Sequence, residues 1–96
     1  MNVTSLLKEK RSEILSIAAN NGAFNVRVFG SIARGEATET SDIDLLVDME
    51  PGRSLLDVGG LLMDLRDLLG CKVDIVTTKG LKKSIKEAVL KEAIPL

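Results

Sequence analysis

The stretch VRVFGSIARGEATETSDIDLLVD, residues 26–48, decides how this chain of 96 residues is interpreted. A short apolar segment runs into Gly30-Ser31, and after ten further residues Asp42 and Asp44 stand one residue apart in a second apolar segment. Carboxylates inside an apolar strand are costly unless a partner neutralises them. Their presence predicts a divalent metal site beside an anion that binds at Gly30-Ser31.

Side-chain alternation predicts three strands, at residues 25–29, 42–48 and 72–77. In the second strand the apolar residues share one face, and Asp42 and Asp44 share the other, about 6.6 Å apart along the strand. Neighbouring carboxylates raise each other's pKa, and Mg²⁺ relieves this conflict by taking carboxylate and phosphate oxygens as ligands. The alternative is a solvated polar face on an edge strand.

The predicted third strand contains a further acid, Asp74. By itself Asp74 could be a cap or an ion-pair partner, but beside the other two aspartates it supplies the third carboxylate that two-metal phosphoryl chemistry requires. Gly30 ends the first strand, and residues 31–34 predict one or two turns of helix before Gly35. A glycine followed by a helix start presents free N–H groups to an anion, although Gly-Ser after a strand is more often only a turn.

Apolar residues at helical spacing predict helices at residues 4–21, at 54–69, and after Gly80 up to Pro95. For the first helix Thr4 or Ser5 can form the N-cap; the second starts at a serine and ends at a glycine. The pair Gly59-Gly60 within the second helix predicts a kink or a close approach to the sheet, with two shorter helices as the alternative. In the last helix we expect one apolar side to be buried, comprising Leu81, Ile85, Ala88, Val89 and Ala93.

The predicted elements follow the order α-β-α-β-α-β-α. They indicate one α/β (α+β) domain over residues 1–96, with a small mixed sheet of three or four strands flanked by helices. The short connection between the first two strands allows them to be antiparallel neighbours, which is why a mixed sheet is expected.

The amino-acid composition excludes several kinds of catalytic site, metal site and binding partner. The chain has no histidine and one cysteine, Cys71, which excludes histidine bases, disulfides within the chain and Cys/His zinc sites. Thirteen basic and 14 acidic residues give a net charge of −1, so direct nucleic-acid binding is not expected. No apolar run has the length of a membrane span and no signal-peptide pattern is present, so we expect a cytoplasmic protein with no membrane association.

Gly30-Ser31, ten intervening residues, Asp42-x-Asp44 and the strand residue Asp74 resemble the nucleotidyltransferase superfamily of DNA polymerase beta. The segment GSIARGEATETSDIDLLVD is similar to the minimal nucleotidyltransferases, or MNT proteins, which are encoded beside HEPN-domain partners as toxin–antitoxin pairs. The resemblance covers nearly the whole chain, including the tail KEAIPL. It implies the nucleotidyltransferase fold and a nucleotidyltransferase activity.

The resemblance also implies roles for individual residues. Gly30 and Ser31 would hold the triphosphate of ATP, which is the expected substrate. Asp42 and Asp44 would hold two Mg²⁺ ions, while Asp74 would complete the metal site and help to deprotonate the attacking hydroxyl. The metals would stabilise the charge that develops on the phosphates.

Basic side chains offer further contacts. Arg34 is a candidate phosphate contact, and its alternative is a salt bridge to Glu36 or Glu39 that fixes the loop. Four lysines crowd the start of the last helix: Lys79, Lys82, Lys83 and Lys86. A phosphate or an acidic partner would explain them, and a solvated basic face is the commoner meaning.

We expect the acceptor to come from another protein, because the chain has no room for a second domain that would hold it. In the family this acceptor is the HEPN toxin, which implies a hetero-oligomer and an antitoxin that transfers AMP to a toxin tyrosine. Two alternatives remain at this point. The chain could neutralise its partner by binding alone, or it could be the catalytic subunit of a small-molecule nucleotidyltransferase.

Overall fold

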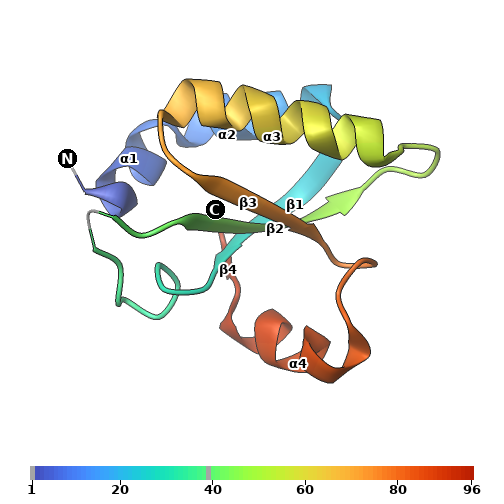
Figure 1. Ribbon diagram of the computed structural model, residues 1–96. Helices are drawn as coiled ribbons and strands as arrows, with labels where there is room; N and C mark the ends of the chain where they lie inside the picture. Colours follow the sequence, from blue (N-terminus) through green and yellow to red (C-terminus); the bar gives the residue numbers. More distant parts are fainter. Residues whose placement is uncertain (1, 39) are drawn as a thin grey trace.

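The computed structural model describes residues 2–38 and 40–96 and has the element order α1-α2-β1-β2-α3-β3-α4-β4 (Figure 1). The helices are α1 (Val3–Glu9), α2 (Arg11–Asn20), α3 (Leu55–Leu69) and α4 (Lys83–Glu92). The strands are β1 (Ala23–Phe29), β2 (Ile43–Met49), β3 (Val73–Thr77) and β4 (Ile94–Pro95). The predicted α/β fold with a mixed sheet is confirmed, and the sheet has the fourth strand.

The four strands lie in the order β3-β2-β1-β4. Strand β1 is antiparallel to both β2 and β4, whereas β2 and β3 are parallel. The parallel pair is connected through α3, as a crossover between parallel neighbours requires. Strands β1 and β2 are consecutive in the chain, so residues 26–48 supply most of the two central strands.

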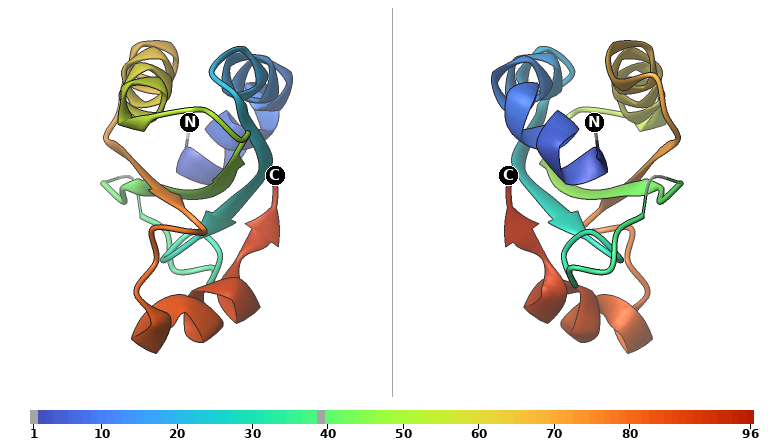
Figure 2. Two further views of the ribbon diagram at one scale, coloured as in Figure 1. Left: turned by 90° about the vertical axis from the view of Figure 1, so that its right-hand side faces the viewer. Right: turned by 90° about the vertical axis from the view of Figure 1, so that its left-hand side faces the viewer.

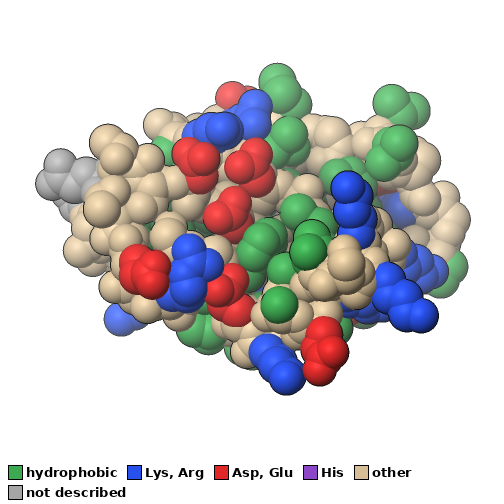
Figure 3. Space-filling model, turned by 60° about the horizontal axis from the view of Figure 1, so that its bottom comes forward, with side chains coloured by type: hydrophobic (Ala, Val, Ile, Leu, Met, Phe, Trp, Pro, Cys, Tyr) green, Lys and Arg blue, Asp and Glu red, His purple; other side chains and the backbone are tan. Residues whose placement is uncertain are grey.

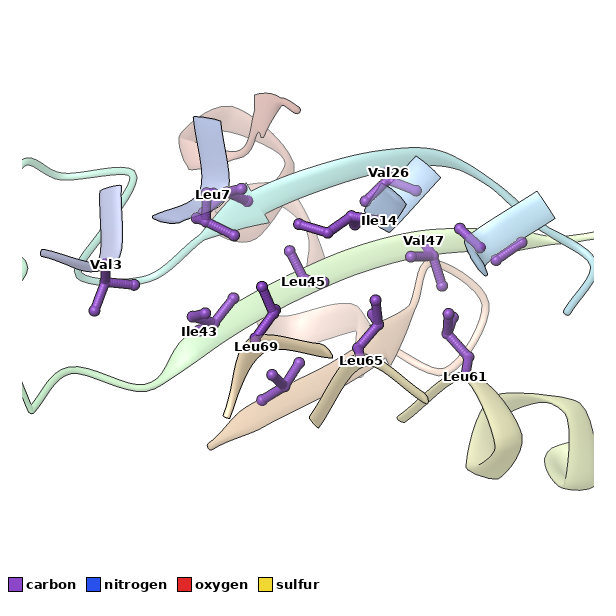
Figure 4. Close-up of a cluster of buried hydrophobic side chains, with 14 residues drawn as sticks. Val3, Leu7, Ile14, Val26, Ile43, Leu45, Val47, Leu61, Leu65 and Leu69 are labelled. Atoms are coloured by element: carbon purple, nitrogen blue, oxygen red, sulfur yellow. The ribbon is translucent and has the colours of Figure 1, made fainter. Parts of the chain in front are cut away.

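Helices cover the two faces of the sheet unequally. Helices α1, α2 and α3 lie on one face, and α4 alone lies on the other (Figure 2). The three-helix face contains the hydrophobic core, in which β2 contributes Ile43, Leu45 and Val47 at 1% exposure or less (Figure 4). The core therefore lies between the sheet and α1–α3.

The predicted helix over residues 4–21 is divided in two. Its break is at Lys10, whose ψ of 8° departs from helical values, and neither glycine nor proline marks this position. The division brings both Leu7 of α1 and Ile14 of α2 into the same buried cluster on the twisted sheet. The N-cap of α1 is Asn2, whose Oδ1 accepts the Ser5 N–H at 2.8 Å, rather than Thr4 or Ser5.

Helix α3 follows its sequence signals closely. Ser54 and Asp57 form a capping box at its start, and Gly70 ends it in the left-handed conformation, with φ 64°. The Gly59-Gly60 pair leaves the helix unbroken; a Cβ at Gly60 would lie 3.0 Å from Asn21 Oδ1, so the close approach is to the end of α2. Within the described part of the chain, no helix is both long and apolar enough to cross a membrane.

The expectation of a buried side on the last helix is wrong. No residue of α4 is buried, and Ile85 and Leu90 are 47% and 39% exposed. The helix ends at Glu92, and the chain then pairs with β1 through Ile94 and Pro95 instead of ending as helix. Pro95 lacks an N–H donor, which is tolerated on an edge strand such as β4.

Candidate functional site

The three aspartates singled out in the sequence lie together on the α4 side of the sheet. Asp44 of β2 is the register partner of Asp74 on β3 and of Phe29 on β1. Asp42 precedes β2 by one residue and alternates onto the same face as Asp44. Figure 3 shows acidic side chains gathered on this side of the molecule, beside an apolar area.

Gly30 lies close to the side chain of Asp44. Its φ is 75°, which is in the left-handed region, and a Cβ built on it would collide with Asp44 Oδ2. Glycine is therefore favoured here chiefly by its conformation, and a side chain at this position would also oblige the Asp44 carboxylate to move. The end of β1 thus lies directly beside the carboxylate on β2.

The crowding of acids changes the chemistry of Asp44. Burial raises the pKa of Asp44, and the charges of Asp74, Asp42 and Glu92 raise it further, while Arg34 opposes them. Like charges held this close favour the binding of a cation or a proton. One local counter-ion is present, because Lys72 Nζ lies 3.5 Å from Asp42 Oδ2, but both side chains are well exposed and the pair is weak.

The donor set suits Mg²⁺ better than a softer metal. Asp42, Asp44 and Asp74 offer only carboxylate oxygens, on adjacent strands and on one face, which is the ligand type that Mg²⁺ prefers. Among residues 2–38 and 40–96, no three acidic or cysteine side chains already converge as a finished ligand group. Asp42 instead points to Lys72, so the three residues fit the metal by chemistry and placement, with side-chain rotation to complete the set.

The predicted short helix after Gly30 is not formed. Residues 31–35 make a turn, in which Arg34 N–H donates to Gly30 O at 3.1 Å and Glu36 N–H donates to Ser31 O at 2.9 Å. Only the first of these two bonds joins residues four apart, as in an α-helix, which is too few to extend into a helix, and Gly35 adopts a φ of 72°. Ser31 lies half-buried in this turn, directly beside Gly30.

Glu92, the last residue of α4, completes the site and was missed at the sequence level. Its carboxylate accepts the Gly30 N–H at 2.8 Å and Arg34 Nη1 at 2.8 Å. Hydrogen bonds from Arg34 and then from the Gly30 N–H hold the pKa of Glu92 below its usual value. No local pattern marks this residue, since only the return of α4 over the sheet brings it to Gly30.

Arg34 forms one of the two contacts that its sequence position suggested, and its phosphate contact stays a prediction. Its Nε donates to Glu36 Oε2 at 3.2 Å, so the expected loop salt bridge with Glu36 is confirmed. Its Nη1 donates to Glu92 Oε1 at 2.8 Å, and a carboxylate offers anionic acceptor oxygens of the kind that a phosphate also offers. Glu39, the other partner considered, lies outside the described residues.

A second polar cluster occupies the far end of the same face. Arg27 Nη2 bonds Asp48 at 3.3 Å and Thr78 Oγ1 at 2.9 Å, and Asn25 Nδ2 bonds Asp48 at 2.9 Å. A hollow of about 640 Å³ borders it; Asp48 and Thr78 of the cluster line the hollow together with apolar and polar side chains from β1, the β2–α3 turn, α3 and the end of β3. The hollow contains none of the predicted site residues, so it is separate from the carboxylate group.

Comparison with known proteins identifies related chains. The family model described as "Nucleotidyltransferase domain" matches residues 7–96. The "Protein adenylyltransferase MntA" of Thermococcus cleftensis is 47% identical over 73 residues, which cover 76% of this chain and 74% of that protein.

Solved structures agree with the fold. One described as "Structure of putative minimal nucleotidyltransferase" has a TM-score of 0.88 and 53% identity, and the match covers 100% of this chain and 97% of that one. A second, "Crystal structure of the toxin-antitoxin with AMP-PNP", has a TM-score of 0.75 at 21% identity and covers 88% of this chain and 69% of that one. At that identity the second likeness shows the fold alone.

Proposed function

This chain belongs to the nucleotidyltransferase domain family, and we propose that it is a protein adenylyltransferase of the MntA type that acts in a toxin–antitoxin pair. It would transfer AMP from ATP to a hydroxyl of its partner protein. The observation that carries the proposal is the register pairing of Asp44 with Asp74 on the face that also holds Asp42, next to Gly30. Pure binding has no need of three crowded carboxylates.

The carboxylates have a defined task in this reaction. Asp42, Asp44 and Asp74 would hold two Mg²⁺ ions, which when bound supply Lewis-acid stabilisation of the phosphate charge. The raised pKa of Asp44 supports this assignment, because burial and then the charges of Asp74 and Asp42 disfavour its ionised form, which a bound cation would stabilise. The donor chemistry of the residues and the charge conflict both favour a hard divalent cation.

Gly30, Ser31 and Arg34 would bind the phosphates of ATP. The Gly30 N–H and the Arg34 guanidinium already converge on one carboxylate in the structure, which supports their ability to hold an anion. Ser31 follows Gly30 in the turn and adds a hydroxyl beside these donors.

The chemical step follows from these positions. The acceptor hydroxyl oxygen attacks the α-phosphorus, the bond to the β-phosphate oxygen breaks, and pyrophosphate leaves. The hydroxyl proton passes to Asp74, whose partner Asp44 remains on the adjacent strand. One AMP is thereby joined to the acceptor through a phosphodiester bond.

The acceptor that we propose is a tyrosine hydroxyl of a HEPN-domain toxin. This chain contains no tyrosine, so it cannot modify itself on that residue type. A solved toxin–antitoxin structure with AMP-PNP shares the fold of this chain, and the pairing with a toxin is part of our proposal. Modification of the toxin would neutralise it.

The test is to incubate the chain with the HEPN-domain toxin encoded beside its gene, ATP and Mg²⁺, and to weigh the toxin by mass spectrometry. We expect the toxin to gain whole AMP groups on tyrosine, and the gain to be lost with Asp42→Asn/Asp44→Asn or with EDTA. Asp67→Asn, an exposed acid on α3, is the matched control and should behave as wild type. An unmodified toxin that both wild type and the double variant still neutralise would show a binding antitoxin instead.

A further inference from the structure

We propose that Glu92 occupies the phosphate position of the nucleotide site and must be displaced when ATP binds, so that α4 acts as a latch on the site. This inference rests on the proposed function. It starts from one contact: Glu92 bonds both the Gly30 N–H and Arg34 Nη1 at 2.8 Å, and its side chain is only 24% exposed. These are the donors assigned to the phosphates.

The competition follows from the number of donors. Gly30 has a single backbone N–H, and it cannot point at a carboxylate and a phosphate oxygen at once. Arg34 has other N–H groups, but two of its nitrogens are already committed to Glu92 and Glu36. A carboxylate and a phosphate are both anions, so they also repel each other at this distance. The two groups are therefore alternative occupants.

The position of Glu92 strengthens the opposition to a triphosphate. Its charge acts on Asp44 together with those of Asp74 and Asp42. While Glu92 is seated, the site carries one more negative charge than the three aspartates supply. When Glu92 leaves, that charge moves away at the same time as the donors become free.

Helix α4 is built so that its end can move without unfolding the core. None of its residues is buried, in contrast to the helices on the other face. Beyond Glu92 the chain is held separately, because Ile94 pairs with Val28 and the Leu96 N–H donates to Val26 O at 3.0 Å. Displacement of Glu92 therefore requires only a local shift of α4, while β3 before it and β4 after it stay in the sheet.

The test compares nucleotide affinity in four full-length proteins: wild type, Glu92→Ala, Glu92→Gln and Glu87→Gln. Glu87 is the control because it lies on the same helix, with an 84% exposed side chain that pairs with Lys91. Calorimetric titration with Mg²⁺ and AMP-PNP should show affinity rising by about tenfold in Glu92→Ala, since a competing occupant lowers the apparent affinity by the fraction of time it is seated. Glu92→Gln should rise less, because its amide oxygen still accepts the Gly30 N–H, and Glu87→Gln should match wild type.

Unchanged or weaker binding by Glu92→Ala overturns the proposal, and weaker binding would make Glu92 a ligand of the nucleotide or its metal. Equal binding by wild type and Glu92→Ala contradicts the displacement of Glu92 but leaves the proposed function intact. Absence of nucleotide binding in all four proteins contradicts both the displacement and the proposed function. Hydrogen exchange of the wild type provides a second readout that needs no variant. Exchange in residues 83–92 should quicken when AMP-PNP binds, and slower or unchanged exchange there would contradict a latch.

Discussion

Strand β2 presents two different faces to the rest of the molecule. On one face Ile43, Leu45 and Val47 are at most 1% exposed, under helices α1–α3. On the other face Asp44 and Asp48 remain partly exposed, although Leu46 between them is fully buried. Alternate residues of a single strand thus belong to a closed apolar core and to a lightly covered charged surface.

This difference indicates that the face under α1–α3 stabilises the fold and that the face under α4 holds the candidate site. The three-helix face excludes water and holds the strands in register, which sets the positions of Asp44 and Asp74 on the other face. The α4 face is crowded with acids, and its raised pKa at Asp44 marks a site that is not optimised for stability. Substitutions on the α4 face should therefore change activity, and substitutions on the three-helix face should change the free energy of unfolding.

The largest effect is expected from Asp44→Asn on the charged face. Loss of this carboxylate should lower the rate of toxin adenylylation by about a thousandfold or more, because metal stabilisation of phosphoryl charge contributes several kcal/mol. The free energy of unfolding should not fall, since ionised Asp44 is disfavoured in the folded state. The measurements are a single-turnover rate by mass spectrometry and urea unfolding, with Asp67→Asn as the exposed control.

If Asp44→Asn lost its activity together with its stability, the two faces would not be separable in the way that the structure indicates. A variant that is folded but retains more than about a tenth of the wild-type rate would instead remove Asp44 from the metal site.

Adjacent leucines on β2 provide the second test, on stability alone. Leu45→Ala should cost about 4 kcal/mol in the free energy of unfolding, because the cavity would lie in a core with rigid neighbours. Leu46→Ala should cost about 2 kcal/mol although both leucines are 0% exposed, since α4 has no buried residue and can collapse onto the gap. Urea denaturation measures both, and equal losses would show that α4 is packed as firmly as the helices on the core face.

Sequence reasoning succeeded where a local pattern carries the information. The two-residue alternation of β2 predicted that Leu45 and Asp44 lie on opposite faces, and Ser54 and Gly70 marked the ends of α3. It failed where tertiary packing decides. Helix α4 has the periodicity of a covering helix, but whether its apolar side is buried depends on how far the helix stands from the sheet.

Glu92 was missed for the same reason. Its separation from Gly30 in the chain is 62 residues, and the bond exists only because β4 returns the chain to β1. The break at Lys10 likewise has no glycine or proline to mark it, although it lets Leu7 and Ile14 enter one buried cluster. The spacing of Gly30, Asp42 and Asp44, by contrast, is local enough to be seen in the sequence.

The smallest expected effect concerns the coupling of charges across β2 and β3. In wild type without metal, carboxyl NMR titration should give Asp44 a pKa above 3.8, and Asp74→Asn should lower that pKa part of the way. The decrease is partial because burial is the largest cause of the shift and stays in place, whereas the Asp74 charge is the second. Asp67→Asn should leave the Asp44 pKa unchanged.

The same coupling determines the sign of the pH dependence of stability. A raised pKa means that ionised Asp44 weakens the folded state, so this loss is present at neutral pH and disappears as the pH falls through the raised pKa towards 3.8. Asp74→Asn should accordingly be slightly more stable than wild type at neutral pH, with the difference narrowing in acid. An Asp44 pKa at or below 3.8 in wild type, or one that ignores Asp74, would mean that the acids on the α4 face are too well solvated to oppose one another. The two faces of β2 would then differ in how deeply they are buried, but not in electrostatic repulsion.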